Sequence, residues 1–224
     1  DALPIYNGES LKNMDLSGMD LSNTELSFAN MKEMNLKKIN LQNANLQRVN
    51  LEQANLQGAK LGGANFKGAN LSQANLAGAN LENANLENTN LENANLENTN
   101  LSQATLTSAE LKNSLLHGSL LKGCDLTKAS LRNAKLGKYS AQDSIGLMRE
   151  INAAQLSGAI LVETDMADVN LSDIPLLNVN FTRVKNLNFE SLAHRQDFAN
   201  AYYSDEQYAI LTELIEGRNP RANK

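Results

Sequence analysis

The chain has 224 residues and a formal net charge of -5, and Cys124 is its only cysteine. One cysteine excludes an internal disulfide and a thiolate metal cluster, and so small a charge favours neither a nucleic-acid binder nor a strongly acidic tail. Aromatic residues make up 4% of the sequence and Trp is absent, so no conventional globular core is expected. No run of about 18 apolar residues occurs, so no membrane span is predicted.

The first ten residues lack the regular pattern that follows them, and they carry Pro4, Tyr6 and Gly8. We expect residues 1–10 to form an N-terminal cap. The chain begins with Asp1 instead of Met. A removed export or transit peptide would explain this start, and so would a chain trimmed for expression. The compartment therefore stays open between an exported or lumenal location and a cytoplasmic one.

A large apolar residue recurs at every fifth position from Leu11 to Leu136. Of these 26 positions 24 are Leu, and the exceptions are Met31 and Phe66. On an α-helix, five steps of about 100° would leave successive leucines about 140° apart. On a flat strand, an odd spacing would send alternate leucines to opposite faces. The period therefore indicates a chain that turns a corner about every five residues, which is a β-solenoid.

A second regular position stands two residues before each of these central positions. From Ala44 to Ala104 it is Ala or Thr, except at Val49. Alternating large and small residues can fill a shared core without voids. The other three positions are mostly polar or Gly, which suits a surface. Because so short a repeat cannot bury its apolar residue alone, successive coils must stack.

The repeat Ala-Asn-Leu-Xaa-Xaa, as in Ala54-Asn55-Leu56-Gln57-Gly58, resembles the pentapeptide-repeat proteins. The resemblance covers roughly residues 9–185. It implies an all-β fold, a right-handed quadrilateral parallel β-helix with four five-residue faces per coil, stacked about 4.8 Å apart. Residues 20 apart would then share a stripe along the rod. We expect this solenoid to occupy residues 11–185.

Two additional leucines, Leu115 and Leu120, stand just before central positions, where side chains normally face outward. They lie five residues apart and so belong to adjacent faces. A local irregularity and a small exposed apolar contact patch both explain them.

The repeat breaks over residues 140–150, where positions 141 and 146 are not large apolar residues. Ile151 and Leu156 nevertheless return on the same count of five, so we interpret the break as two repeats rewritten in place. Ser140 is predicted to cap a short helix with Asp143 near its start. We expect the segment to bulge from one corner while the coil continues beneath it.

In the pentapeptide-repeat proteins, protruding loops contact partners. The resemblance therefore makes this segment the first candidate for a partner contact. Its candidate residues are Ser140, Asp143, Ile145, Leu147 and Arg149.

Residues 186–224 are predicted to form a C-terminal α-helical cap over the open end of the solenoid. Ser204 to Gln207 is a capping box that opens a helix, and Gly217 is expected to end it. Before it, a first helix is predicted with an apolar stripe of Phe189, Leu192, Ala193, Phe198 and Ala201. The second helix, which the capping box opens, carries a stripe of Tyr208, Leu211 and Ile215. Some members of the family dimerise through this end. Tyr202, Tyr203 and Tyr208 are the candidate contacts for a homodimer.

No catalytic, cofactor-binding or metal-binding residues are predicted. His117 and His194 lie far apart without companion ligands at metal spacing. His117 follows a central leucine, where side chains are expected to face solvent, and Cys124 takes the small inner position of a buried, inert thiol. The sequence also lacks a Gly-rich phosphate loop and a nucleophile elbow. An enzyme is therefore not expected.

Two binding functions remain. The best-known members of the family protect gyrase and topoisomerase by resembling a DNA duplex, which requires negative charge aligned along the rod. The stripe through Glu92 instead alternates in sign; it reads Lys12, Lys32, Glu52, Ser72, Glu92, Lys112 and Arg132. The sequence therefore favours a scaffold that presents flat polar faces to an unknown protein partner, with DNA mimicry as the alternative.

Overall fold

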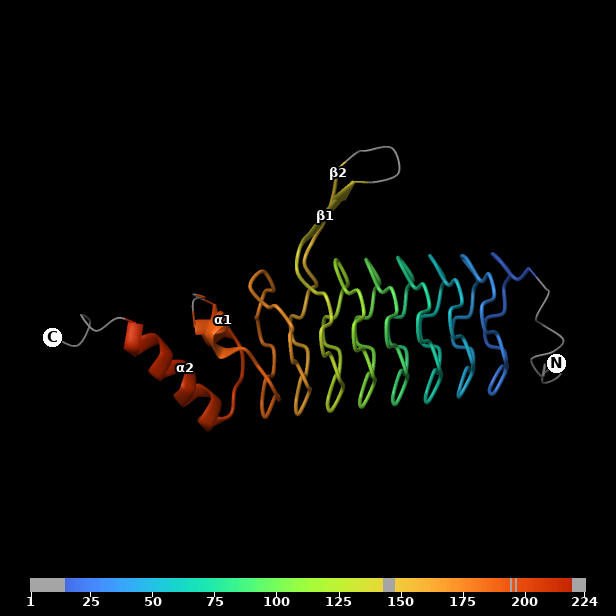
Figure 1. Ribbon diagram of the computed structural model, residues 1–224. Helices are drawn as coiled ribbons and strands as arrows, with labels where there is room; N and C mark the ends of the chain where they lie inside the picture. The colour runs from blue at the N-terminus through green and yellow to red at the C-terminus, as the bar shows by residue number, and fades with distance from the viewer. Residues whose placement is uncertain (1–14, 143–147, 194, 196, 219–224) are drawn as a thin grey trace.

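The structure is a computed structural model that describes residues 15–142, 148–193, 195 and 197–218. The expected N-terminal cap over residues 1–10 lies outside this range. Stacked coils form a rod, a hairpin projects from one side of it, and two α-helices lie at its C-terminal end (Figure 1).

Each coil of the rod pairs with the next through isolated parallel bridges between residues 20 apart, from Asp20–Asn40 to Leu115–Lys135. The Leu81 N–H donates to the Asn100 carbonyl at 2.7 Å, and the Asn100 N–H donates to the Ala79 carbonyl at 3.0 Å. Since 20 residues hold four repeats, every coil has four faces. The right-handed quadrilateral β-helix is thus confirmed.

We number the faces by the central residues of one coil. Face 1 carries Leu76, face 2 carries Leu81, face 3 carries Leu86 and face 4 carries Leu91. Each corner takes the number of the face that it follows.

The corners are tight turns closed by one backbone hydrogen bond. At corner 2, the Ala84 N–H donates to the Leu81 carbonyl at 3.0 Å, and Asn83 has a φ of 59°. A positive φ at the third residue is typical of a type II turn and favours Gly and Asn. Asn80 Oδ1 also accepts the Glu82 N–H at 3.1 Å, which explains why Asn precedes so many central leucines.

The core is the column of central and small side chains inside the rod. Leu81, Leu86 and Leu91 are fully buried, and each contributes about 1.5–3 kcal/mol to folding before entropy is subtracted. The buried hydroxyl of Thr89 donates to the Phe66 carbonyl at 3.0 Å, so Thr can replace Ala inside the rod.

Charged side chains at the corners pair along the rod. On corner 4, Lys32 bonds Glu52 at 3.0 Å and Lys112 bonds Glu92 at 3.6 Å. The sign alternation seen in the sequence therefore becomes a set of ion pairs between coils.

The irregular segment is a β-hairpin, and two expectations about it are wrong. Strands β1 (Tyr139–Gln142) and β2 (Met148–Ile151) pair antiparallel, so Ser140 lies in a strand and caps no helix. Bridges across the hairpin join residues 35 apart, as in Leu120–Gln155. The segment is therefore an insertion of 15 residues, not two rewritten repeats. Because 15 is a multiple of five, the insertion leaves the repeat phase unchanged.

The hairpin replaces one two-residue corner. The Ala154 N–H donates to the Leu136 carbonyl at 2.8 Å, which is the same bond that closes ordinary corners such as Leu81–Ala84. Residues 137–153 therefore stand where the other corners have two residues. Ile151, expected at a central inward position, lies instead in β2.

The C-terminal helices differ in part from the prediction. The expected first helix is divided into α1 (Phe189–Ala193) and the 3-10 helix η1 (Phe198–Asn200). Helix α2 spans Asp205–Arg218, one residue beyond Gly217. Its capping box is confirmed, because the Gln207 N–H donates to Ser204 Oγ at 3.3 Å and the Ser204 N–H donates to Gln207 Oε1 at 3.0 Å.

The C-terminal segment covers the edge of the last coil. The Phe181 N–H donates to the Tyr202 carbonyl at 2.7 Å. Arg195 donates to the Leu171 and Ser172 carbonyls at 2.7 and 2.6 Å. Backbone groups that would form an open sheet edge are thereby satisfied. No sequence pattern indicated that Arg195 would have this role.

Candidate functional site

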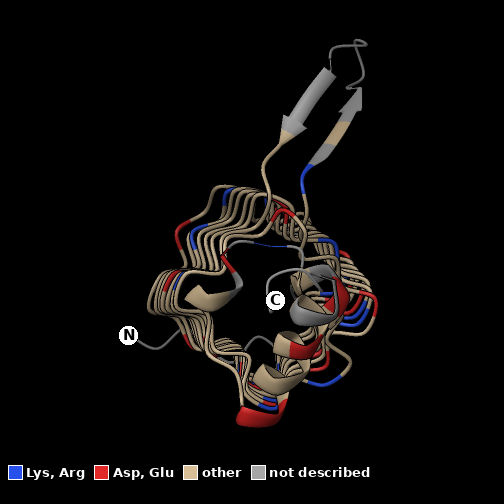
Figure 2. Ribbon diagram, turned by 90° about the vertical axis from the view of Figure 1, so that its left-hand side faces the viewer, with Lys and Arg blue, Asp and Glu red and all other residues tan. Residues whose placement is uncertain are grey.

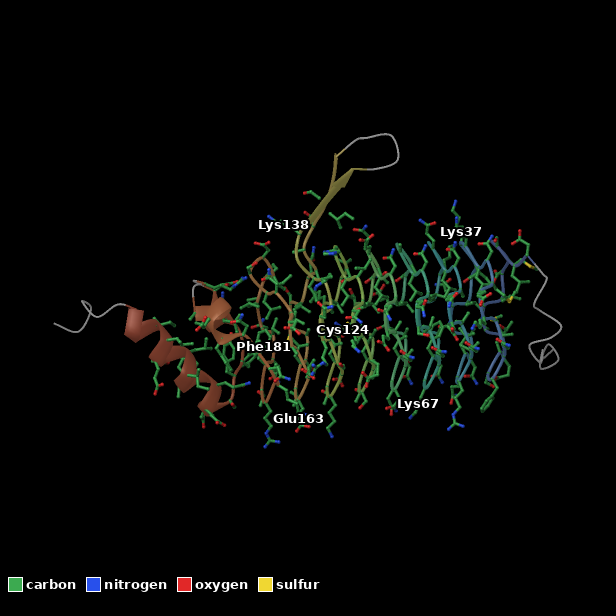
Figure 3. All side chains as sticks on the ribbon, viewed as in Figure 1. Lys37, Lys67, Cys124, Lys138, Glu163 and Phe181 are labelled. Carbon is green, nitrogen blue, oxygen red and sulfur yellow. The ribbon has the colours of Figure 1, made fainter. Side chains whose placement is uncertain are left out.

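The hairpin is the main projection from an otherwise even rod, and it leaves the rod at corner 1 (Figure 2). Ser140 in β1 is exposed, whereas Arg149 pairs with Ala141 in the hairpin ladder. Three of the candidate contacts, Asp143, Ile145 and Leu147, lie outside the described residues. Lys37 and Lys138 lie along the hairpin edge of the rod, and Lys67 and Glu163 along the opposite edge (Figure 3).

His117 fixes the foot of the hairpin. Its Nδ1 lies 2.6 Å from the Gly137 carbonyl, so the imidazole donates through Nδ1–H. The residue is only 9% exposed, and the expectation that its side chain faces solvent is wrong. Its position in the repeat is an outward one, but the inserted hairpin covers it. The sequence signal for His117 was therefore misleading.

Gly118 brings the hairpin foot close to the preceding coil. It has a φ of 69°, and a Cβ at this position would meet the Asn98 side chain and lie 3.0 Å from Ile151 Cγ2. Only Gly satisfies both the backbone conformation and the close approach. His117 and Gly118 together thus seat both legs of the hairpin.

The coil that bears the hairpin is only partly bonded to the last coil. On faces 1 and 2, the described residues lack the ladder bonds that would join Leu136 to Asn170 and Leu156 to Pro175. Pro175 has no N–H to contribute. A pocket of about 280 Å³ lies beside this seam. Its lining residues are Lys138, Asn152, Ala153, Gln155, Ser157, Asp173 and Pro175.

The three candidate tyrosines at the C-terminal end have different environments. Tyr202 and Tyr208 are 59% and 51% exposed, so Tyr208 does not lie on the buried face of α2 with Leu211. Tyr203 stacks on Phe181. Burial, with a smaller contribution from the nearby Asp197, raises the pKa of Tyr203 to about 12. Tyr203 is therefore part of the cap, and only the other two present their side chains to solvent.

The described residues hold neither a reactive thiol nor a cluster of metal-binding side chains. Cys124 is fully buried, and burial raises the pKa of its thiol to about 12. Its Sγ lies 2.7 Å from the Leu101 carbonyl. The placed part of the chain contains no group of three His, Cys, Asp or Glu residues able to hold a metal ion. Within the same ranges, no helix is long and apolar enough to cross a membrane.

The two additional leucines near the hairpin behave differently from each other. Leu115 is half-buried, and Leu120 is 37% exposed. They lie on faces 1 and 2, on either side of the corner that carries His117. Leu120 bridges to Gln155, two residues beyond the hairpin foot, so an exposed apolar side chain lies beside the hairpin.

Comparison of the sequence with protein-family models identifies one family of repeat proteins. The sequence matches the Pentapeptide repeats family, with 8 copies, over residues 10–37, 35–73, 69–107 and 104–138. A comparison with curated proteins gave no match.

Three solved structures illustrate the likeness. A trypsin-treated variant of QnrB1, a plasmid-mediated fluoroquinolone resistance protein, aligns with a TM-score of 0.63 and 18% identity over 90% of this chain and 83% of that one. A pentapeptide repeat protein from the thylakoid lumen of Arabidopsis thaliana is 32% identical over 50% of this chain and 74% of its own, with a TM-score of 0.40. HetL, involved in heterocyst differentiation regulation in the cyanobacterium Nostoc sp. strain PCC 7120, is 30% identical over 71% and 75%, with a TM-score of 0.33.

The family match covers more than half of the chain, and the five-residue repeat, the 20-residue coil and the small inner side chains all agree with it. The chain therefore belongs to the pentapeptide-repeat family.

Proposed function

We propose that this protein is a non-enzymatic scaffold that binds a protein partner through the hairpin at corner 1. One observation carries the proposal: a 15-residue insertion interrupts an otherwise regular rod at a single corner and forms an ordered ladder from Tyr139–Ile151 to Gln142–Met148. A two-residue turn would close that corner equally well, so stability of the rod does not account for the insertion.

The way the hairpin is seated supports a role in recognition. His117 bonds its first leg at Gly137, and Gly118 admits its second leg at Ile151. A projection held in a fixed direction loses less conformational entropy on binding than a free loop does. The exposed Ser140 and Lys138 would supply hydrogen-bonding groups to the partner, together with Asn152, Gln155 and Ser157, which line the pocket beside the foot.

The test removes the hairpin and keeps the rod. Deleting residues 138–152 and changing Ala153→Gly restores a two-residue corner with Gly where φ is positive. The control deletes residues 76–95, which is one whole coil, and leaves the hairpin intact. Partners captured by the full chain are identified by mass spectrometry and then tested singly. The full chain and the control should bind the same partner, and the hairpin deletion should not.

Retention of that partner by a hairpin deletion that melts at the wild-type temperature would overturn the proposal. Its loss from the coil deletion as well would assign binding to the faces of the rod instead.

DNA mimicry directed at gyrase is the alternative that we do not favour. The similarity to QnrB1, at 18% sequence identity, supports a shared fold and not a shared function. Along corner 4, the anionic Glu52 and Glu92 are each paired with a lysine, which does not support a continuous anionic row. The purified protein should accordingly leave gyrase supercoiling unchanged.

A further inference from the structure

Charge is segregated along the rod. Residues 68–111 contain five acidic residues and no Lys or Arg, whereas residues 112–138 contain six basic residues and one acidic residue. Because one coil takes 20 residues, the first group forms an acidic ring around the rod and the second a basic ring. The rings lie two coils apart on corners 2 and 3, which is about 10 Å at the usual strand spacing.

Face 3 displays both rings at its two borders. At corner 2, Glu82 and Lys122 lie 40 residues apart in one stripe, and both are exposed. At corner 3, Glu87 belongs to the acidic ring and Lys128 to the basic ring. Glu87 pairs with Lys67 at 2.8 Å, but no ion pair within the described ranges involves the other three.

The row between the two rings on face 3 has small, uncharged side chains. It consists of Ser102 at corner 2, Thr105 on the face and Thr107 at corner 3. Short hydroxyl side chains allow another surface to approach closely, and they introduce no charge of their own.

We propose that face 3 binds a second copy of this chain in an antiparallel, twofold-symmetric dimer. A twofold axis through the neutral row reverses the rod direction, so the acidic ring of each copy meets the basic ring of the other. Because such an axis keeps each corner opposite the same corner, Glu82 meets Lys122 and Glu87 meets Lys128. Every contact occurs twice, as symmetry requires.

The next row outward fits the same axis. Lys67 lies one coil before Glu87, and Glu163 lies one coil beyond Lys128, so these two also come opposite each other. Beyond them Arg48 would face Arg183, which is paired with Glu163 at 3.5 Å. The attraction is therefore concentrated in the five central rows.

The other faces do not fit this arrangement. Faces 1 and 4 border corner 4, where Lys112 occupies the middle row, so a twofold axis there would bring two lysines together. Faces 1 and 2 border corner 1, from which the hairpin projects (Figure 2). Lys67 and Glu163 mark the edge opposite the hairpin (Figure 3), so face 3 reaches the side that the hairpin leaves open.

Charge-swap variants of the full chain test the dimer by sedimentation equilibrium. At about 0.01 M ionic strength, where the screening length is about 30 Å, the wild type should approach twice the monomer mass; at about 1 M, where it is about 3 Å, the monomer should predominate. Glu82→Lys and Lys122→Glu should each raise the dissociation constant about tenfold, since each puts like charges together twice. The double variant Glu82→Lys/Lys122→Glu should restore wild-type association.

The matched control exchanges Glu92→Lys and Lys112→Glu on corner 4, with the same changes of charge, and should leave association unchanged. A wild type that stays monomeric at low salt would refute the proposal. The proposal would also be refuted if the dimer persisted in the Glu82→Lys and Lys122→Glu variants and was lost in Tyr208→Ser. That result would assign the contact to the C-terminal helices.

Discussion

The ring of Tyr203 stacks on the ring of Phe181, with centroids 5.6 Å apart and planes inclined by 10°. Phe181 is the last large inward side chain of face 3, and Tyr203 directly follows the segment that bridges to Asn180. The stack therefore joins the core of the rod to its cap. Phe181 is fully buried, and Tyr203 packs against the same core.

Tyr203 offers a test of the cap. Its hydroxyl is buried and finds no hydrogen-bond partner in the described part of the protein. Tyr203→Phe keeps the stack and removes this unsatisfied group, so the free energy of unfolding should stay constant or rise by about 1 kcal/mol. Tyr203→Ala should lower it by about 2 kcal/mol or more. Urea denaturation of both variants decides the matter; equal losses would contradict this account of the stack.

The inside and outside of the rod are distinguished by two adjacent residues. Leu91 is fully buried, so Leu91→Ala should leave a cavity and cost about 2–5 kcal/mol. Glu92 lies at the surface in an ion pair with Lys112, so Glu92→Ala should change stability by about 0.5 kcal/mol at most. Thermal unfolding followed by circular dichroism provides the comparison. Similar shifts in both variants would disprove the assigned packing.

Two serines in the small inner position should respond in opposite directions to the same change. Ser114 Oγ is buried without a partner among the described residues, whereas Ser119 Oγ donates to the Leu116 carbonyl at 2.7 Å. Ser114→Ala should therefore stabilise the protein by about 1 kcal/mol, and Ser119→Ala should destabilise it by about as much. Denaturant midpoints measure both. A stabilising Ser119→Ala would contradict the hydrogen bond.

Two glycines at corner 1 share one backbone conformation but have different neighbours. Gly78 and Gly118 have φ values of 67° and 69°. A Cβ at Gly78 would meet nothing within 4 Å, whereas one at Gly118 would meet Asn98 and Ile151. Gly78→Ala should cost about 1–2 kcal/mol for the left-handed backbone alone. Gly118→Ala should cost more and increase amide hydrogen exchange in β1 and β2. Identical exchange in the two variants would argue against Gly118 seating the hairpin.

Acid should weaken the attachment of the cap. Hydrogen bonds from Arg195 hold the pKa of Asp197 below its ordinary value of 3.8, with Nε–Oδ1 and Nη2–Oδ2 distances of 2.7 Å. As the pH falls, the Asp197 carboxylate is therefore protonated in the unfolded chain before it is protonated in the folded protein. The stability that the ionised carboxylate contributes is fully present above the pKa of the unfolded chain, and it is lost as the pH falls through the pKa of the folded protein. The stability advantage of the wild type over Asp197→Asn should shrink between about pH 6 and pH 2. A constant difference would exclude Asp197 as the source.

Most of the rod could be predicted because its information is local and repeated. A central leucine every fifth residue, a small residue two positions earlier and Asn before the leucine each have a direct physical cause in the coil. Cys124 was correctly predicted to be buried for the same reason. His117 was not, because its neighbour Gly137 belongs to an insertion whose path the repeat does not encode.

The sequence by itself determined the solenoid, its inward and outward positions and the capping box at Ser204, since these depend on periodicity and on contacts within a few residues. Only the tertiary structure decided that residues 137–153 leave the rod as a hairpin. An insertion of 15 residues preserves the period of five, so the sequence pattern is the same for an insertion and for rewritten repeats. The bond from Ala154 to the Leu136 carbonyl, which joins residues 18 positions apart in the sequence, distinguishes the two.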